Sequence, residues 1–281
     1  MCLEIIICVV DTMPKTNNWL NCGDVNPREY GGLFIRYNKD LKEFAKLKKT
    51  LKIIAGVIIF FTLPSLLFFG FVYFKYNEDL PIGNQTKKAD ILAHKMLISL
   101  NADAYKATNN LEWTFRRKHH YKWDKKHNSC QVYWKKNKVI LNLNNPSISK
   151  VFVNKQEINS SDKKELIQTA TNYFNNDSFW LVAPYKVFDQ GTSRSIVKHN
   201  GKDALLVTYS KGGTTPGDSY LWILDDNYKP TKFKMWVDIL PIGGLEASWS
   251  DWKTTESNAK LPTNHQLFFF SFDMGDVKGT K

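Results

Sequence analysis

The sequence predicts an α+β protein: an N-terminal transmembrane helix followed by a curved antiparallel β-sheet of about ten strands with two helices. Two observations carry this expectation. Residues 53–74 form an uncharged apolar stretch, and after residue 109 apolar residues recur at every second position. With 43% hydrophobic and 23% charged residues, the chain of 281 residues has a globular composition, which excludes disorder and collagen-like repeats.

The apolar stretch 53–74 is long enough to cross a bilayer. At 1.5 Å per residue its length is about 33 Å, against a hydrocarbon core of roughly 30 Å. Pro64 lies in its middle, and spanning helices tolerate proline where the freed carbonyl finds another partner. A buried core helix is the alternative, but the absence of charge and the flanking lysines favour a transmembrane helix.

The charges on either side of this stretch predict its orientation. Residues 36–52 carry seven basic and two acidic side chains, whereas residues 75–89 carry three basic and two acidic ones. The positive-inside rule therefore places the N-terminus in the cytoplasm. Bulky and charged residues follow the stretch, so cleavage is not expected. We expect a single-pass, uncleaved anchor in the inner membrane, with the domain after it in the periplasm.

The N-terminal segment 1–52 is expected to be cytoplasmic. Its first thirty or so residues contain three of the four cysteines and no periodicity that connects them to the rest. Two interpretations stay open, a disordered tail and a start site placed too far upstream. No function is assigned to this segment.

Residues 75–84 read as a short polar linker, and residues 85–281 as the exported domain. Residues 75–281 carry 30 basic and 21 acidic side chains, a net charge of +9. One helix is predicted by an apolar stripe with helical spacing, formed by Ala89, Leu92, Ala93, Met96, Leu97, Leu100 and Ala104.

A second helix is predicted after a capping box, in which Asp162 precedes Glu165 by three residues. It is expected to end at 175–177, an Asn-Asn-Asp run. Alternating apolar residues predict strands between 113 and 153. Asn200-Gly201 predicts a tight hairpin turn. The remaining strands are predicted at 193–199, 204–210, 219–224, 231–239, 245–254 and 265–272.

Catalytic and metal-binding motifs are absent from the sequence. The cysteines form no CxxC pair, and His119 and His120 would point to opposite faces of a strand, so they cannot share a metal. The Gly-rich segment 211–218 lacks the phosphate-binding signature and reads as a wide turn. Basic runs at 116–118 and 135–136 fit a solvated or lipid-facing surface. We therefore expect no enzyme, no cofactor, no metal and no nucleic-acid partner.

Aromatic residues are abundant, and eight of the nine tryptophans lie in the exported domain. They could simply fill the core. Alternatively, they could line a cavity for an apolar ligand, as in small barrels. The candidate cavity residues are Trp113, Phe115, Trp134, Trp180, Tyr220, Trp222, Trp236 and Trp249.

Four sequence segments resemble those of a family of uncharacterised bacterial envelope proteins, whose fold is similar to that of the LolA and LppX-type lipoprotein carriers. They lie at 178–185, 213–226, 235–252 and 261–263. The resemblance implies an unclosed β-barrel of about eleven strands, with helices on its concave side and an apolar ligand between them. Those carriers are soluble or lipid-anchored, whereas this chain is expected to be held by a spanning helix. Such an anchor favours local hand-over or sensing of a membrane-derived lipid over its transport across the envelope.

Three functions stay open at this stage. The leading hypothesis is a membrane-anchored, non-catalytic envelope protein that binds an acyl chain, a lipid or a lipoprotein in the half-barrel. The alternative is a scaffold or interaction domain with a filled core. The third is a hydrolase with an unrecognised site.

Overall fold

The computed structural model describes residues 27–159, 161–211 and 216–281, and the side chains from residue 42 onward. The chain divides into two compact units, residues 1–68 and 69–281, and each is treated by itself. The second unit contains the last two turns of the N-terminal helix and the whole C-terminal domain. The N-terminal segment 1–26, with its three cysteines, lies outside the described residues.

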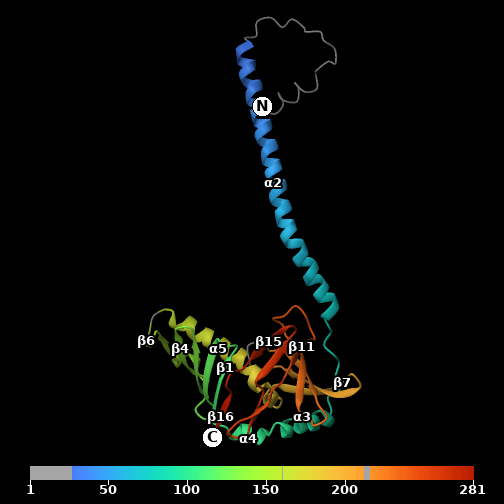
Figure 1. Cartoon of the computed structure of the whole chain (residues 1–281), viewed down its shortest axis with the longest axis vertical. Helices are drawn as coiled ribbons and strands as arrows, with labels where there is room; N and C mark the ends of the chain where they lie inside the picture. The colour runs from blue at the N-terminus through green and yellow to red at the C-terminus, as the bar shows by residue number, and fades with distance from the viewer. Residues whose placement is uncertain (1–26, 160, 212–215) are drawn as a thin grey trace. The chain divides into compact units, whose positions relative to one another are not determined.

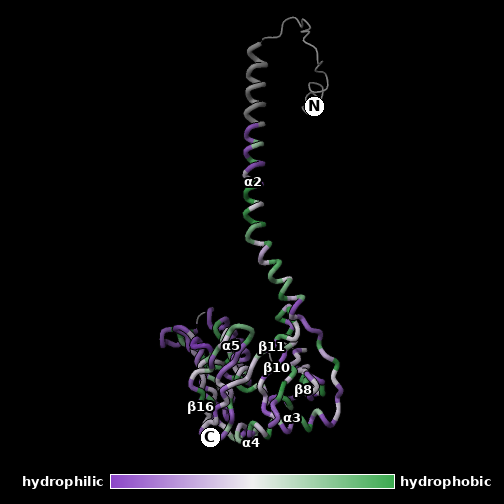
Figure 2. Tube along the Cα trace, turned by 45° about the vertical axis from the view of Figure 1, so that its right-hand side comes forward, coloured by the Kyte–Doolittle hydropathy of each residue, from purple (hydrophilic) through white to green (hydrophobic). Residues whose placement is uncertain are grey.

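The first described element is a single long helix, α2 (Pro27–Tyr76), drawn in blue to teal in Figure 1. Its part Lys42–Tyr76 is long and apolar enough to cross a membrane, and none of its most apolar window is buried. Figure 2 shows this apolar stretch in green along the tube. Pro64 lies inside the helix, and near it the Thr62 and Ser65 hydroxyls donate to the Ile58 and Phe61 carbonyls. The helix thus contains the predicted stretch 53–74 and could span a membrane.

The domain is built on two antiparallel sheets of seven strands and a small two-stranded ribbon. The first sheet has the order β16 (Lys278–Thr280), β1 (Asn110–Phe115), β2 (His119–Asp124), β3 (Ser129–Trp134), β4 (Asn137–Asn142), β5 (Lys150–Val153), β6 (Gln156–Ile158). The second has the order β15 (Phe270–Asp273), β14 (Asn264–Leu267), β11 (Leu245–Ser248), β10 (Pro230–Trp236), β9 (Ser219–Leu224), β8 (Lys202–Tyr209), β7 (Thr192–His199). The ribbon pairs β12 (Lys253–Thr254) with β13 (Lys260–Leu261).

The two sheets adjoin along β1. The backbone N–H groups of Thr114 and Arg116 donate to the carbonyls of Met274 (3.0 Å) and Asp273 (3.1 Å), which lie just after and at the end of β15. The arrangement is unclosed, because β6 and β7 end the two sheets and do not pair with each other among the described strands. The α+β class and the antiparallel, unclosed sheets confirm the prediction at that level.

The prediction of one sheet of about ten strands is wrong in its count. The described residues form sixteen strands, several of them only two to four residues long, and periodicity does not detect such short strands. The C-terminal strand is also interrupted at Gly275, whose φ of +63° is a left-handed conformation that favours glycine. This interruption is where the second sheet passes into the first.

Both predicted helices exist with different bounds. The first is divided into α3 (Lys87–Ser99) and α4 (Ala102–Ala107), because Asn101 between them adopts a left-handed φ of 55°. The second, α5 (Lys163–Val182), does not end at 175–177 but continues to Val182. Asp177 is buried in its middle and hydrogen-bonded by its neighbours, so the polar run does not stop the helix. The Asp162 side chain makes no capping hydrogen bond.

One hydrophobic core joins the two sheets to α3 and α5. The first part of α5 packs against β4 and β5, and α3 packs against β7 and β8. Trp180, near the C-terminal end of α5, instead meets Phe233 on β10 and Phe272 on β15. Helix α5 therefore crosses from one sheet to the other, as Figure 1 shows. The hairpin predicted at Asn200-Gly201 is confirmed, with φ values of 50° and 78°.

Candidate functional site

Seven of the eight predicted cavity residues face the core shared by the two sheets, and each is at most 9% exposed. The exception is Trp236, which lies on the opposite face of β10. It packs with a separate small cluster that includes Leu206 and Leu221, and its indole nitrogen donates to the Glu78 carbonyl at 2.8 Å. The seven that share the core are Trp113, Phe115, Trp134, Trp180, Tyr220, Trp222 and Trp249.

Aromatic side chains of α5 occupy the space in front of the second sheet. Phe179 lies 4.7 Å from Tyr220 between ring centroids, and Trp180 lies 5.6 Å from Phe233. Behind them, the Trp222 ring is 5.5 Å from that of Trp249. These separations are those of rings in direct contact. The second sheet's aromatic side chains are therefore covered by the helix.

The same helix covers the first sheet. Trp113 is stacked on Tyr121 at 4.5 Å, and Phe174 of α5 lies 6.4 Å from Trp113. Tyr173 of α5 meets Trp134 edge to face at 5.7 Å. Helix α5 thus contributes four aromatic side chains, two to each sheet, and they fill the region where the sequence suggested a ligand.

His265 is a fully buried histidine within this core. Its Nδ1 lies 3.0 Å from the Ser248 carbonyl, to which it donates, and its ring lies 4.8 Å from that of Trp249. Burial lowers the pKa of His265 from 6.5 to about 4. Its Nε2 and the indole nitrogens of Trp222 and Trp249 have no hydrogen-bond partner among the described residues. The core therefore holds polar atoms whose hydrogen-bonding capacity is not used by the protein.

A buried hydrogen-bond network ties β2 to α5. One carboxylate oxygen of Asp177 accepts from His119 Nδ1 at 2.7 Å and from the Tyr121 hydroxyl at 2.5 Å. Burial, together with the charge of Asp177, raises the pKa of Tyr121 far above its usual value of 10. His120 points to the other face, where it meets Thr114 at 2.9 Å. The opposite orientation of the two histidines agrees with the strand geometry, and the His119 side chain is largely buried.

The network also includes an aromatic contact with α5. The His119 ring is stacked on Tyr173 at 4.0 Å, and no serine or cysteine bonds to it in the described part of the chain. Cys130 is fully buried, which raises the pKa of its thiol well above the usual value. Among the described residues no group of three or more His, Cys, Asp or Glu side chains is placed to hold a metal ion.

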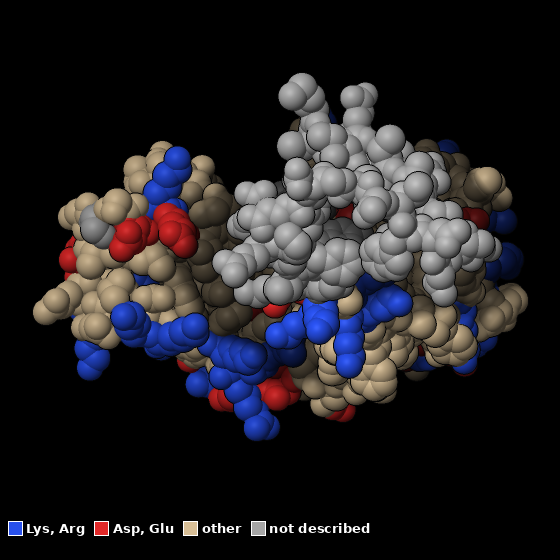
Figure 3. Space-filling view, turned by 90° about the horizontal axis from the view of Figure 1, so that it is seen from above, with Lys and Arg blue, Asp and Glu red and all other residues tan. Residues whose placement is uncertain are grey.

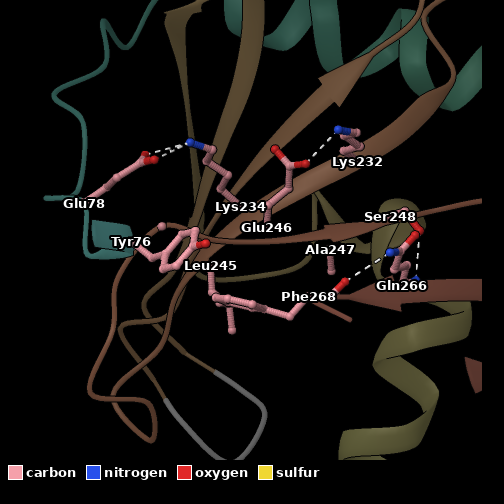
Figure 4. A pocket seen from close by; sticks show the side chains of 11 residues that line it. Tyr76, Glu78, Lys232, Lys234, Leu245, Glu246, Ala247, Ser248, Gln266 and Phe268 are labelled. Carbon is pink, nitrogen blue, oxygen red and sulfur yellow. Dashed lines mark hydrogen bonds and ion pairs between the residues drawn. The ribbon is translucent and has the colours of Figure 1, made fainter. Parts of the chain in front are cut away.

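A polar groove of about 430 Å³ lies on the outer face of the second sheet (Figure 4). Two ion pairs border it. Lys234 lies 2.6 Å from the carboxylate of Glu78, and Lys232 lies 2.7 Å from that of Glu246. The groove is lined by residues of β10, β11 and β14, by two residues at and just after the end of α2, and by Gly244 and Phe268 in the adjoining loops. The lining residues are Tyr76, Glu78, Lys232, Lys234, Gly244, Leu245, Glu246, Ala247, Ser248, Gln266 and Phe268.

The groove therefore presents both signs of charge. We call it the juxtamembrane groove, because Tyr76 in its lining ends the helix that is long and apolar enough to cross a membrane. Tyr76 is the last residue of α2, and in Figure 4 its ring lies beside Phe268 on the groove's border. Beyond the groove, basic side chains form a band across the face seen in Figure 3, and acidic ones form smaller groups. A smaller hollow of about 320 Å³ lies on the first sheet and includes Glu112, Lys122 and Lys278.

The juxtamembrane groove has no local signature in the sequence. Its charged residues alternate along strands, at 232 and 234 on β10, and such alternation usually marks a solvated face. The pairing of β10 with β11, which sets Lys232 opposite Ser248 and Lys234 opposite Glu246, and the contact of Glu78 with Lys234 bring these charges together. Comparison with family models and with curated proteins finds no match for this chain. The interpretation of the groove therefore depends on its geometry alone.

Replacing Trp222 by alanine should destabilise the domain far more than replacing Trp236. Trp222 is fully buried beneath α5, so Trp222→Ala is expected to cost about 3–5 kcal/mol of unfolding free energy. Trp236 is half-buried on the other face, and Trp236→Ala should cost about 1 kcal/mol. Urea unfolding followed by circular dichroism measures both. Equal costs would contradict the assignment of the two faces.

The buried His265 should make the domain less stable in mild acid. Its pKa is lower in the folded than in the unfolded state, so the unfolded state binds more protons between pH 6.5 and 4. Stability contributed by the neutral ring is complete above pH 6.5 and decreases by about 3 kcal/mol as the pH falls to 4. Carboxylates titrate in the same range, so the test compares unfolding free energies with those of His265→Phe. Parallel pH profiles of the two proteins would contradict the prediction.

Proposed function

We propose that this protein is a membrane-anchored, non-catalytic interaction protein of the cell envelope, with its C-terminal domain outside the cytoplasm. Helix α2 would be its anchor, since Lys42–Tyr76 could cross a membrane. The excess of basic residues before the apolar stretch supports a cytoplasmic N-terminus in the inner membrane. Under this proposal the domain presents an outer surface to a partner and binds nothing in its core.

The observation that carries the proposal is the filled concave side. Burying about ten methylenes of an acyl chain in a dry cavity would contribute roughly 8 kcal/mol gross. Here that space is already taken by rings of α5 in contact with both sheets, such as Phe174 and Phe179. A chain entering it would first have to displace aromatic contacts of similar value. The packing therefore favours the filled-core alternative over a carrier.

The juxtamembrane groove is the surface that we propose for the partner. It offers two cations and two carboxylates, and the Lys234 side chain among them is only 13% exposed. Paired charges that border a concave surface suit a polar, extended segment of another protein. Such a segment can accept hydrogen bonds from the lysines and donate hydrogen bonds to the carboxylates. Because Tyr76 lines the groove, that partner would be met close to the membrane surface.

A second candidate is binding of an acyl chain, a lipid or a lipidated protein beneath α5. It is favoured by the buried nitrogens of Trp222, Trp249 and His265, which have no partner among the described residues. Leaving such groups unsatisfied costs about 1–3 kcal/mol each, and a ligand bearing ester or amide groups could satisfy them. This function requires α5 to move away from the sheets.

The orientation can be tested with cysteine labelling. The native cysteines at 2, 8 and 22 precede the helix, and Cys130 is buried, so a membrane-impermeant maleimide should not label the wild-type protein in intact spheroplasts. Lys202→Cys, at an exposed site of β8, should be labelled without permeabilisation. Labelling of the wild-type protein before permeabilisation would contradict the proposed sidedness.

The groove can be tested by photo-crosslinking in native membranes. A benzophenone amino acid at Gln266, which lines the groove, should give a discrete adduct with another protein. The same group at Lys198, which is also exposed and lies on β7, is the matched control and should give none. Glu246→Arg, which removes the partner of Lys232, should abolish the adduct. Adducts of equal yield at both positions, or none at Gln266, would argue against the groove.

A further inference from the structure

Three consecutive phenylalanines form the tip of the hairpin between β14 and β15. We call Phe268, Phe269 and Phe270 the aromatic tip. Phe269 is 74% exposed and Phe270 is 58% exposed, and their rings lie 4.3 Å apart. Large apolar side chains grouped at a projecting turn expose apolar surface that usually marks an interaction site. The aromatic tip therefore needs a partner outside the domain.

The geometry of this tight turn does not favour phenylalanine. Leu267 pairs directly with Phe270, which leaves a loop of two residues. Phe268, its first residue, has a φ of +56°, a left-handed conformation that favours glycine or asparagine and that a bulky aromatic residue rarely adopts. A strained backbone that carries an unexpected side chain points to a role for that side chain.

The aromatic tip lies against the end of the apolar helix. The ring of Phe268 meets that of Tyr76, the last residue of α2, at 5.0 Å. Directly after Tyr76, the backbone N–H of Glu78 donates to the Gly243 carbonyl at 2.9 Å, and the Asn77 side chain accepts from the Gly243 N–H at 2.8 Å. No free linker therefore separates the helix end from this side of the domain.

A second loop that contacts the end of α2 also presents an exposed apolar residue. Residues 237–244 join β10 to β11 and include Gly243, which holds Asn77 and Glu78. Ile239 in this loop is 71% exposed. Two separate loops therefore contact residues 76–78, and each of them presents exposed apolar side chains.

We propose that the aromatic tip and Ile239 insert into the interfacial layer of the bilayer that α2 crosses. The inference rests on the proposed membrane anchor, which would place Tyr76 at the boundary between lipid and water. Aromatic side chains favour that boundary, and apolar side chains on a short projecting loop gain from burial among headgroups and upper acyl chains. Phe268 contacts Tyr76 directly, so the tip adjoins the residue that would lie at this boundary.

Insertion would hold the domain close to the membrane and set the height of the juxtamembrane groove. Phe268 and Tyr76 both line that groove, so its opening would lie at the level of the lipid headgroups. A second copy of the chain or another protein could also cover apolar side chains. The bilayer is favoured because the tip is continuous with the helix that the bilayer would hold.

Lipid photolabelling of the full-length protein tests the proposal. The protein is reconstituted in liposomes of phosphatidylethanolamine and phosphatidylglycerol, which contain a lipid with a diazirine near the glycerol end of its acyl chain. After illumination and trypsin digestion, mass spectrometry locates the adducts. We expect adducts on peptide 261–278, which contains the tip, and on peptide 235–253, which contains Ile239. Peptide 96–106 is the control, because Ile98 on α3 is 77% exposed but belongs to another part of the domain.

A double variant, Phe269→Ser with Phe270→Ser, should reduce labelling of peptide 261–278 at least five-fold and leave that of peptide 53–75 unchanged. Because both side chains are exposed, the fold should be retained, which the tryptophan fluorescence of the domain verifies. Labelling of peptide 261–278 no stronger than that of peptide 96–106, with peptide 53–75 labelled, would overturn tip insertion and keep the anchor. An unlabelled peptide 53–75 would overturn the anchor itself. A cross-link from the tip to another protein, without lipid adducts, would also overturn the proposal.

Discussion

The packing of α5 across the two sheets is the interaction on which the domain depends. The two sheets adjoin through two backbone hydrogen bonds between β1 and residues 273–274. The side chains of α5 provide a much larger connection. Tyr173 and Phe174 pack on the first sheet, and Phe179 and Trp180 pack on the second. The Asp177 carboxylate between these two pairs accepts hydrogen bonds from β2. One helix thus holds both sheets in a single core.

This packing also decides what the fold can do. An unclosed pair of curved sheets offers a concave side, and in this protein its own helix occupies that side. The groove beside Tyr76 lies outside this core and joins charged side chains to the end of the apolar helix. The filled core, the groove and the aromatic tip are the features on which the proposed role at a membrane surface rests.

The sequence predicted the elements whose signals are local. The apolar stretch, the Asn200-Gly201 turn and the strand at 219–224 follow from composition, turn chemistry and alternation, and the structure contains each of them. The end of α5 was missed, because Asn175, Asn176 and Asp177 read as a terminator while Asp177 is satisfied by residues more than fifty positions away. Local sequence cannot reveal a partner brought close only by the fold.

The candidate site was predicted less well for the same reason. Alternation places Trp113 and Trp222 on the same face as their strands' other apolar residues, but it could not show that α5 fills the space in front of them. Trp236 falls on the other face, because the register of β10 shifts between Pro230 and Lys232 and its inward side chains are Phe233 and Met235. The groove depends on strand pairing and on Glu78, which lies far from β10 in sequence.

The central claim is that the concave side is filled by the protein itself. Native mass spectrometry of a fragment beginning at Asn77, which keeps the contacts of Glu78, tests it most directly when the fragment is purified from an envelope fraction without detergent. The account predicts the mass of the polypeptide alone, unchanged after incubation with phospholipids. One bound mass in the lipid range per polypeptide would contradict it and would favour an acyl ligand beneath α5.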